Sequence, residues 1–174
     1  MTNLSKKIEV LANLAIIVAG CLLAVVLIKN HLFQRPSEGL SRQQTSSQDM
    51  EGSRLSTIDV DWSQSRQTLL LALSSSCHFC SESAPFYKRL VQSKNGTRLV
   101  AVLPEPAEGG QGYLRRLGVS VDEIRQLNLD KIGVQGTPTL LLVDNSGVVK
   151  KSWIGKLLPE QEEAVVSALL GDGE

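Results

Sequence analysis

The pattern of apolar and polar positions divides the 174 residues into three parts. Residues 10–28 are apolar all round except for Asn13, and as a helix they would span about 30 Å, the thickness of a bilayer core. Residues 30–56 show no apolar period, which predicts a flexible polar linker. Residues 57–174 alternate apolar runs with amphipathic stretches, and this length suffices for one α/β domain with a single core.

Within this domain, short apolar runs predict strands that are covered on both faces, at residues 69–72, 98–103 and 139–143. Aromatic and aliphatic residues recur at four-residue spacing after Phe79, which predicts an amphipathic helix. Pro159 opens an expected last helix and Gly171 closes it. Gly109-Gly110-Gln111-Gly112 predicts a loop, and nothing in residues 104–129 marks a site. A sheet flanked by helices is therefore expected.

The N-terminal apolar run predicts a transmembrane signal anchor at residues 10–29, after a short tail of residues 1–9. Positive charges flank the run on both sides, so their count does not decide its orientation. We expect the short tail to stay in the cytoplasm and the domain to lie outside it. A lipoprotein is the alternative, because residues 18–21 (Val-Ala-Gly-Cys) resemble a lipobox that would lipidate Cys21. The chain remains apolar beyond Cys21, which favours the uncleaved anchor.

The segment Cys77-His78-Phe79-Cys80 holds the only two cysteines outside the apolar run and follows a predicted strand directly. A cysteine at a helix N-terminus faces unpaired backbone N–H groups, which favour the reactive thiolate. Two intervening residues place the second sulfur one helical turn further on, within reach of a disulfide. The pair predicts a redox dithiol. A structural disulfide or half of a zinc site are the alternatives, but for zinc the chain offers only His31 and His78 as further donors.

A second motif, residues 133–143 (Gly-Val-Gln-Gly-Thr-Pro-Thr-Leu-Leu-Leu-Val), joins a glycine-punctuated turn and a proline to an apolar strand. With the dithiol and with Pro85 five positions after Cys80, it closely resembles the thioredoxin-like superfamily, over about residues 57–170. The resemblance implies an α/β fold with a central mixed β-sheet flanked by helices. It also implies a cis-proline, Pro138, packed beside the dithiol, and a backbone at Thr137 that pairs with an extended substrate segment.

The chain also departs from the superfamily's patterns. Thioredoxin has a tryptophan before the first cysteine and a buried aspartate on the preceding strand, where this chain has Ser76 and Leu71. Membrane-tethered relatives of the TlpA or redoxin type often carry a glutamate three residues after the second cysteine, where this chain has Ser83. Glu82 lies one residue short, and about 100° of helical rotation separates the two positions. A solvated helix face is therefore the expectation for Glu82.

These features predict a membrane-tethered thiol–disulfide oxidoreductase of the bacterial inner membrane, with its domain in the periplasm. Cys77 is expected to form the mixed disulfide and Cys80 to resolve it, so that their own disulfide is the redox group and no metal or separate cofactor is needed. His78 is the candidate for tuning the dithiol, because an imidazolium there would favour the thiolate, and a solvent-facing residue without effect is the alternative. The sequence does not show the direction of electron flow.

The expected partners are protein thiols and disulfides, together with a membrane or envelope electron-transfer partner. The net charge is zero, so nucleic acid is not indicated. A second hypothesis is an extracytoplasmic module that uses the dithiol to deliver copper or to serve cytochrome assembly, because soft thiolates bind Cu(I). A peroxidase is a weaker third hypothesis.

Overall fold

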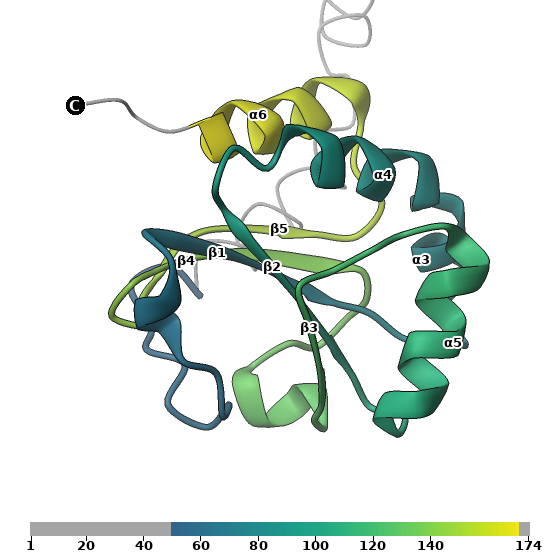
Figure 1. Ribbon diagram of the computed structural model, residues 1–174, viewed down its shortest axis with the longest axis horizontal. Helices are drawn as coiled ribbons and strands as arrows, with labels where there is room; N and C mark the ends of the chain where they lie inside the picture. The colour runs from purple at the N-terminus through teal and green to yellow at the C-terminus, as the bar shows by residue number, and fades with distance from the viewer. Residues whose placement is uncertain (1–49, 171–174) are drawn as a thin grey trace, which may run out of the picture. The chain divides into compact units, whose positions relative to one another are not determined.

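The computed structural model describes residues 50–170 of the chain, drawn in colour in Figure 1. The expected anchor at residues 10–29 and most of the expected linker lie outside the described residues. Within residues 50–170, no helix is long and apolar enough to cross a membrane.

Five strands form one mixed sheet in the order β3-β2-β1-β4-β5. Their bounds are β1 Gln67–Ala72, β2 Arg98–Leu103, β3 Glu123–Gln126, β4 Thr139–Asp144 and β5 Val149–Ile154. The central strand β1 pairs parallel with β2 and antiparallel with β4, while β3 joins β2 in parallel and β5 joins β4 antiparallel. The three strands expected from apolar runs are therefore the inner strands of the sheet.

The helices are α3 His78–Glu82, α4 Ala84–Ser93, α5 Ala107–Leu117 and α6 Pro159–Leu170, with short 3-10 helices η1 at Trp62–Gln64 and η2 at Leu129–Ile132. The four α-helices cover one face of the sheet, and α4 and α5 connect successive strands, whereas the opposite face is covered by η2 and the segment before η1. Figure 1 shows α4 and α6 side by side on one face, where Arg89 of α4 pairs with Glu162 and Glu163 of α6.

The helix α5 corrects one expectation, because it begins at Ala107 and includes the glycines that predicted a loop. Gly110 explains the difference. A Cβ added there would lie 3.2 Å from Leu103 Cδ1 and 3.5 Å from Ile124 Cγ2, so the helix packs on β2 and β3 through a position that suits glycine. Gly118 then ends α5 in the left-handed conformation with φ of 67°.

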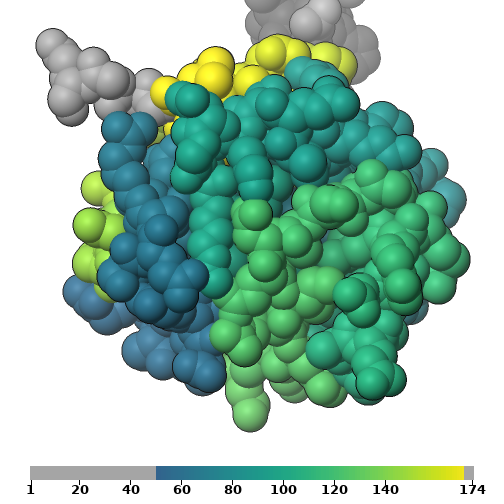
Figure 2. Space-filling model, in the orientation of Figure 1, coloured from purple at the N-terminus to yellow at the C-terminus, as the bar shows by residue number. Residues whose placement is uncertain are grey.

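The core has two layers because side chains alternate across the sheet. Leu69 and Leu71 of β1 pack under the helices, in a cluster that also contains Cys80. Leu70 and Ala72 pack on the opposite face, against η2 and the segment before η1. Figure 2 shows this segment in blue beside the green segment that contains β3 and η2. The strands formed by the continuous apolar runs are thus covered on both faces, as expected.

Residues 50–56 also pack on the domain, although their pattern resembles that of the polar linker. Met50 and Leu55 are buried in the second layer, and Arg54 forms a β-bridge with Val148. Two isolated apolar residues produce no period in the sequence, so only the tertiary contact reveals their role.

We expect Leu71→Ala to lower the free energy of unfolding by about 2–5 kcal/mol, because it leaves a cavity in the layer beneath the dithiol helix. Urea unfolding of the detergent-solubilised chain, followed by the fluorescence of Trp62 and Trp153, would measure the loss. Leu158→Ala is the matched control, since Leu158 is 47% exposed. An equal effect of the two substitutions would contradict the assignment of Leu71 to the core.

Candidate active site

The turn Ser74–Ser76 carries the chain from β1 to the dithiol. The Cys77 N–H donates to the Ser74 carbonyl at 3.1 Å, which closes the turn. Cys77 is the N-cap of α3, and its Sγ accepts the N–H of Cys80 at 3.1 Å. The first cysteine therefore stands at the helix N-terminus, as the sequence predicts, and its sulfur meets one of the unpaired N–H groups there.

The two cysteines differ in environment. Cys77 is half-buried, whereas Cys80 is fully buried in the core layer under the helices. Burial, and next the hydrogen bond to Cys77, raise the pKa of the Cys80 thiol to about 12. Since the thiolate is the nucleophile, burial and the raised pKa both make Cys80 a poor nucleophile in this state.

The loop before β4 reaches the dithiol from the far side. The Thr137–Pro138 peptide bond is cis, which confirms the expectation for Pro138. The Cys77 Sγ donates to the Thr137 carbonyl at 3.3 Å. The loop is itself held by two bonds, from Thr139 Oγ1 to the Gly136 carbonyl and from the Gly155 N–H to the Pro138 carbonyl, each 2.7 Å long. The structure thus brings the two sequence motifs together.

His78 points along α3 toward Glu82. Its Nε2 lies 3.1 Å from Glu82 Oε1, and the other oxygen of Glu82 accepts from Lys156 Nζ at 2.8 Å. The bond from Lys156 is the main reason that the pKa of Glu82 is lowered. Glu82 therefore holds two basic side chains, a role that its one-residue shift from the family position did not suggest. His78 is 79% exposed.

Two tyrosines surround the buried sulfur, and sequence analysis assigned neither to the site. Burial raises the pKa of Tyr87, and the charge of Cys80 adds to it. Tyr113 of α5 lies with its hydroxyl 3.2 Å from Ser81 Oγ, and burial likewise raises its pKa. Tyr87 is fully buried and packs in the core layer under the helices.

Glu105 is the residue at this site that the sequence analysis missed. Its Oε1 accepts from the Ser75 N–H at 2.7 Å and from the Ser75 and Ser74 hydroxyls at 2.7 and 3.0 Å. A signal was present, since the residue lies two positions after the end of β2 and the carboxyl ends of neighbouring parallel strands meet at one edge of a sheet.

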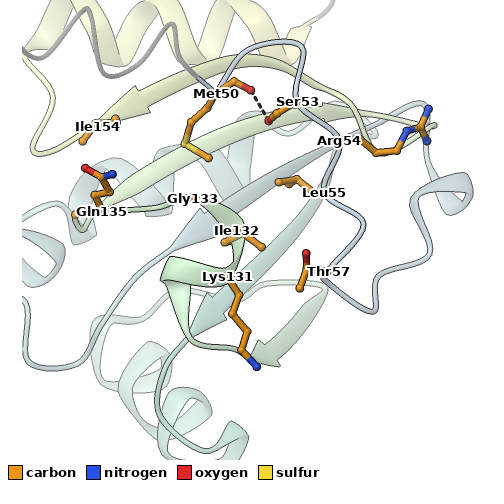
Figure 3. Close-up of a pocket in the computed structure, with 11 residues that line it drawn as sticks. Met50, Ser53, Arg54, Leu55, Thr57, Lys131, Ile132, Gly133, Gln135 and Ile154 are labelled. Carbon is orange, nitrogen blue, oxygen red and sulfur yellow. Dashed lines mark hydrogen bonds between the residues drawn. The ribbon is translucent and has the colours of Figure 1, made fainter.

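A pocket of about 540 Å³ lies beside the loop of Pro138 but on the opposite face of the sheet (Figure 3). Leu55 and Ile132 line the pocket, and so does Gly136, which belongs to the loop of Pro138. Neither cysteine lines it, so it is not part of the dithiol site. Among residues 50–170, no three His, Cys, Asp or Glu side chains gather closely enough to hold a metal ion.

Neither a family model nor a curated protein matches the sequence. Several solved structures do resemble the fold. A protein described as a thiol:disulfide interchange protein, DsbE, of Chlorobium tepidum is 25% identical with a TM-score of 0.53, over 64% of this chain and 84% of that chain. The thioredoxin domain of a thiol-disulfide oxidoreductase from Bacteroides vulgatus is 15% identical with a TM-score of 0.52, over 69% and 91%.

A protein described as a thioredoxin from Neisseria meningitidis is 21% identical with a TM-score of 0.52, over 67% of this chain and 81% of that chain. These likenesses agree with the mixed sheet and its flanking helices. The chain therefore has a thioredoxin-like fold, which it shares with solved proteins that are described as thiol–disulfide oxidoreductases.

We expect iodoacetamide at pH 8 to modify Cys77 of the reduced protein and to spare Cys80. The raised pKa of Cys80 keeps this thiol protonated at that pH, and the side chain is buried as well. Mass spectrometry of the peptides would locate the label. In urea both cysteines should react, which is the control, and equal labelling of the folded protein would contradict the assignment.

Proposed function

We propose that the protein exchanges disulfides with protein substrates through Cys77 and Cys80. The observation that supports this most directly is the unequal burial of two sulfurs that lie one helical turn apart, with the accessible one at the helix N-terminus. That arrangement suits a nucleophile that meets the substrate and a second thiol that acts only after the first has reacted.

In the reducing direction, the Cys77 thiolate attacks one sulfur of a substrate disulfide. A mixed disulfide forms, and the other substrate sulfur leaves as a thiolate. Cys80 then gives up its proton and attacks the Cys77 sulfur, which forms the Cys77–Cys80 disulfide and releases the second substrate thiolate. Two electrons have passed to the substrate, and the reverse sequence oxidises a substrate dithiol.

The surroundings of Cys77 support the first step. The Cys80 N–H that donates to its sulfur stabilises the charged thiolate more than the thiol. The Thr137 carbonyl, 3.3 Å from the same sulfur, belongs to the loop that would pair with an extended substrate segment. Phe79 is 54% exposed next to the sulfur and offers an apolar contact for such a segment.

His78 is proposed as a modest tuner of the dithiol. An imidazolium at this position would favour the thiolate, but its Nε2 faces the Glu82 carboxylate, which is also bound to Lys156. The negative charge of Glu82 offsets part of the positive charge of His78. The side chains are exposed, so solvent screens what remains.

The proposed place of action is the outer side of the bacterial inner membrane. The support is the apolar run of residues 10–28, followed by a polar stretch that is long enough to keep the domain apart from the bilayer. A membrane or envelope protein would exchange electrons with the dithiol, and that partner determines whether this protein reduces or oxidises its substrates.

Cys80→Ser should trap substrates, because the mixed disulfide on Cys77 then has no resolving thiol. We expect high-mass species in membrane extracts that disappear on reduction, and mass spectrometry of these species identifies the partners. Cys77→Ser is the matched control and should trap few. Equal trapping by the two variants would refute the division of roles. No trapping by either, with tight Cu(I) binding by the reduced protein, would favour the metal-delivery hypothesis.

Reporter fusions after Ser56 test the location. If the domain lies outside the cytoplasm, alkaline phosphatase fused there becomes active and a cytoplasmic fluorescent protein stays dark. The opposite pair of results would reverse the orientation. A fusion that remains in the soluble fraction would contradict the anchor itself.

A further inference from the structure

The carboxylate of Glu105 accepts hydrogen bonds from the turn that precedes Cys77. One oxygen, Oε1, accepts three hydrogen bonds of 2.7–3.0 Å from Ser74 and Ser75. The same turn is closed by the bond from the Cys77 N–H to the Ser74 carbonyl, and the Ser74 and Ser76 hydroxyls lie 2.9 Å apart. A displacement of Glu105 would therefore reach Cys77 through only two residues.

The fold brings Glu105 there through the parallel pairing of β1 with β2. Ala72 pairs with Val102, and the Leu73 N–H donates to the Val102 carbonyl at 3.0 Å, so both strands end at the same edge. Glu105 stands between Pro104 and Pro106, whose rings fix their own φ angles and stiffen the segment. The carboxylate is thus held on a short, rigid connection rather than on a mobile loop.

Glu105 carries a negative charge at neutral pH. Burial is the largest influence on its pKa and acts to raise it, but the hydrogen bonds from Ser75, from its own backbone and from Ser74 outweigh burial and leave the pKa below its usual value. The second oxygen, Oε2, is buried and has no hydrogen-bond partner among the described residues. Within residues 50–170, no cation forms an ion pair with this carboxylate.

The charge acts on the same surroundings as the dithiol. The pKa of Tyr113 is raised first by burial, and the charges of Cys80, Cys77 and Glu105 each raise it further. The other ionisable groups around α3 are His78 and Glu82 on the helix itself, Lys156 after β5, and Tyr87 on α4. His78 and Lys156 are both paired with Glu82, whereas Glu105 is a half-buried carboxylate beside the turn that pairs with no cation among residues 50–170.

We propose that Glu105 is a positioning residue of the dithiol site, which fixes the turn before Cys77 and places a permanent negative charge near its sulfur. This inference rests on the proposed function of the Cys77–Cys80 pair. A negative charge disfavours the Cys77 thiolate and so disfavours the reduced state in which that thiolate forms. Glu105 thereby opposes the N-terminus of α3, which favours the thiolate, and makes the disulfide a weaker oxidant.

The test compares two substitutions in the full chain, solubilised in detergent. Glu105→Gln keeps an oxygen that accepts from Ser75 and removes the charge, whereas Glu105→Ala removes both. Glu108→Gln is the matched control, because Glu108 is an exposed carboxylate in the first turn of α5. One readout is the rate of iodoacetamide labelling at Cys77 at pH 7, followed on the Cys77 peptide so that Cys21 does not contribute.

The second readout is the equilibrium with glutathione. In this reaction two glutathione thiols reduce the Cys77–Cys80 disulfide, and one glutathione disulfide and the protein dithiol are formed. We expect Glu105→Gln to raise the labelling rate about threefold to tenfold and to shift the equilibrium constant toward the dithiol by a similar factor, where tenfold corresponds to about 30 mV. Glu108→Gln should change neither value by more than about 1.5-fold.

Glu105→Ala should share the shift in equilibrium. In addition, its reduced dithiol should reduce the disulfides of insulin several-fold more slowly than that of Glu105→Gln, since its turn has lost the acceptor. Equal exchange rates of the two variants would overturn the positioning role. Unchanged or lowered labelling of Cys77 in Glu105→Gln would overturn the role of the charge. If Glu105→Ala does not fold, the labelling rate and the glutathione equilibrium of Glu105→Gln still test that role. A wild-type protein that glutathione cannot reduce would instead refute the proposed function.

Discussion

The hydrogen-bonded pairing of β1 with β2 on one side and with β4 on the other is the constraint on which the site depends. Because β1 is the central strand, its carboxyl end lies beside the end of β2 and the start of β4. The segment after β2 and the loop before β4 therefore lie at the same edge of the sheet as the turn after β1. Cys77, Glu105 and Thr137 come from three separate parts of the chain and meet there. Small movements of the strands would separate them, and the dense core resists such movements.

The chemistry of the pair follows from unequal solvation. Cys77, the N-cap of α3, is half-buried, whereas Cys80 turns into the core, so the same short segment holds a partly accessible sulfur and a protected one. Leu71 stands where thioredoxin has a buried aspartate, and β1 contributes no carboxylate to this layer. Two carboxylates lie close to α3 and the turn before it: Glu82 pairs with its two basic partners, and Glu105 accepts from the turn before Cys77.

Much of the fold could be predicted because burial leaves a local trace. The runs at residues 69–72, 98–103 and 139–143 are apolar on both faces, and they are the three inner strands. The edge strand β3 was not expected, since its residues are only partly buried and two of them are charged. Residues 109–112 of helix α5 were predicted to form a loop, because glycines weaken a helix locally, but Gly110 is also the position that lets the helix approach β2 and β3.

The sequence by itself determined the two motifs and the order of the main elements, since a dithiol at a strand-to-helix junction and a glycine-bounded proline are properties of consecutive residues. Tertiary structure alone decided which side chains face the sulfurs. Glu105 looked like an ordinary loop residue, and Glu82 like a solvated one, because their partners lie 30 and 74 positions away along the chain. A hydrogen bond between distant residues exists only once the sheet has brought their elements together, and no local pattern records it.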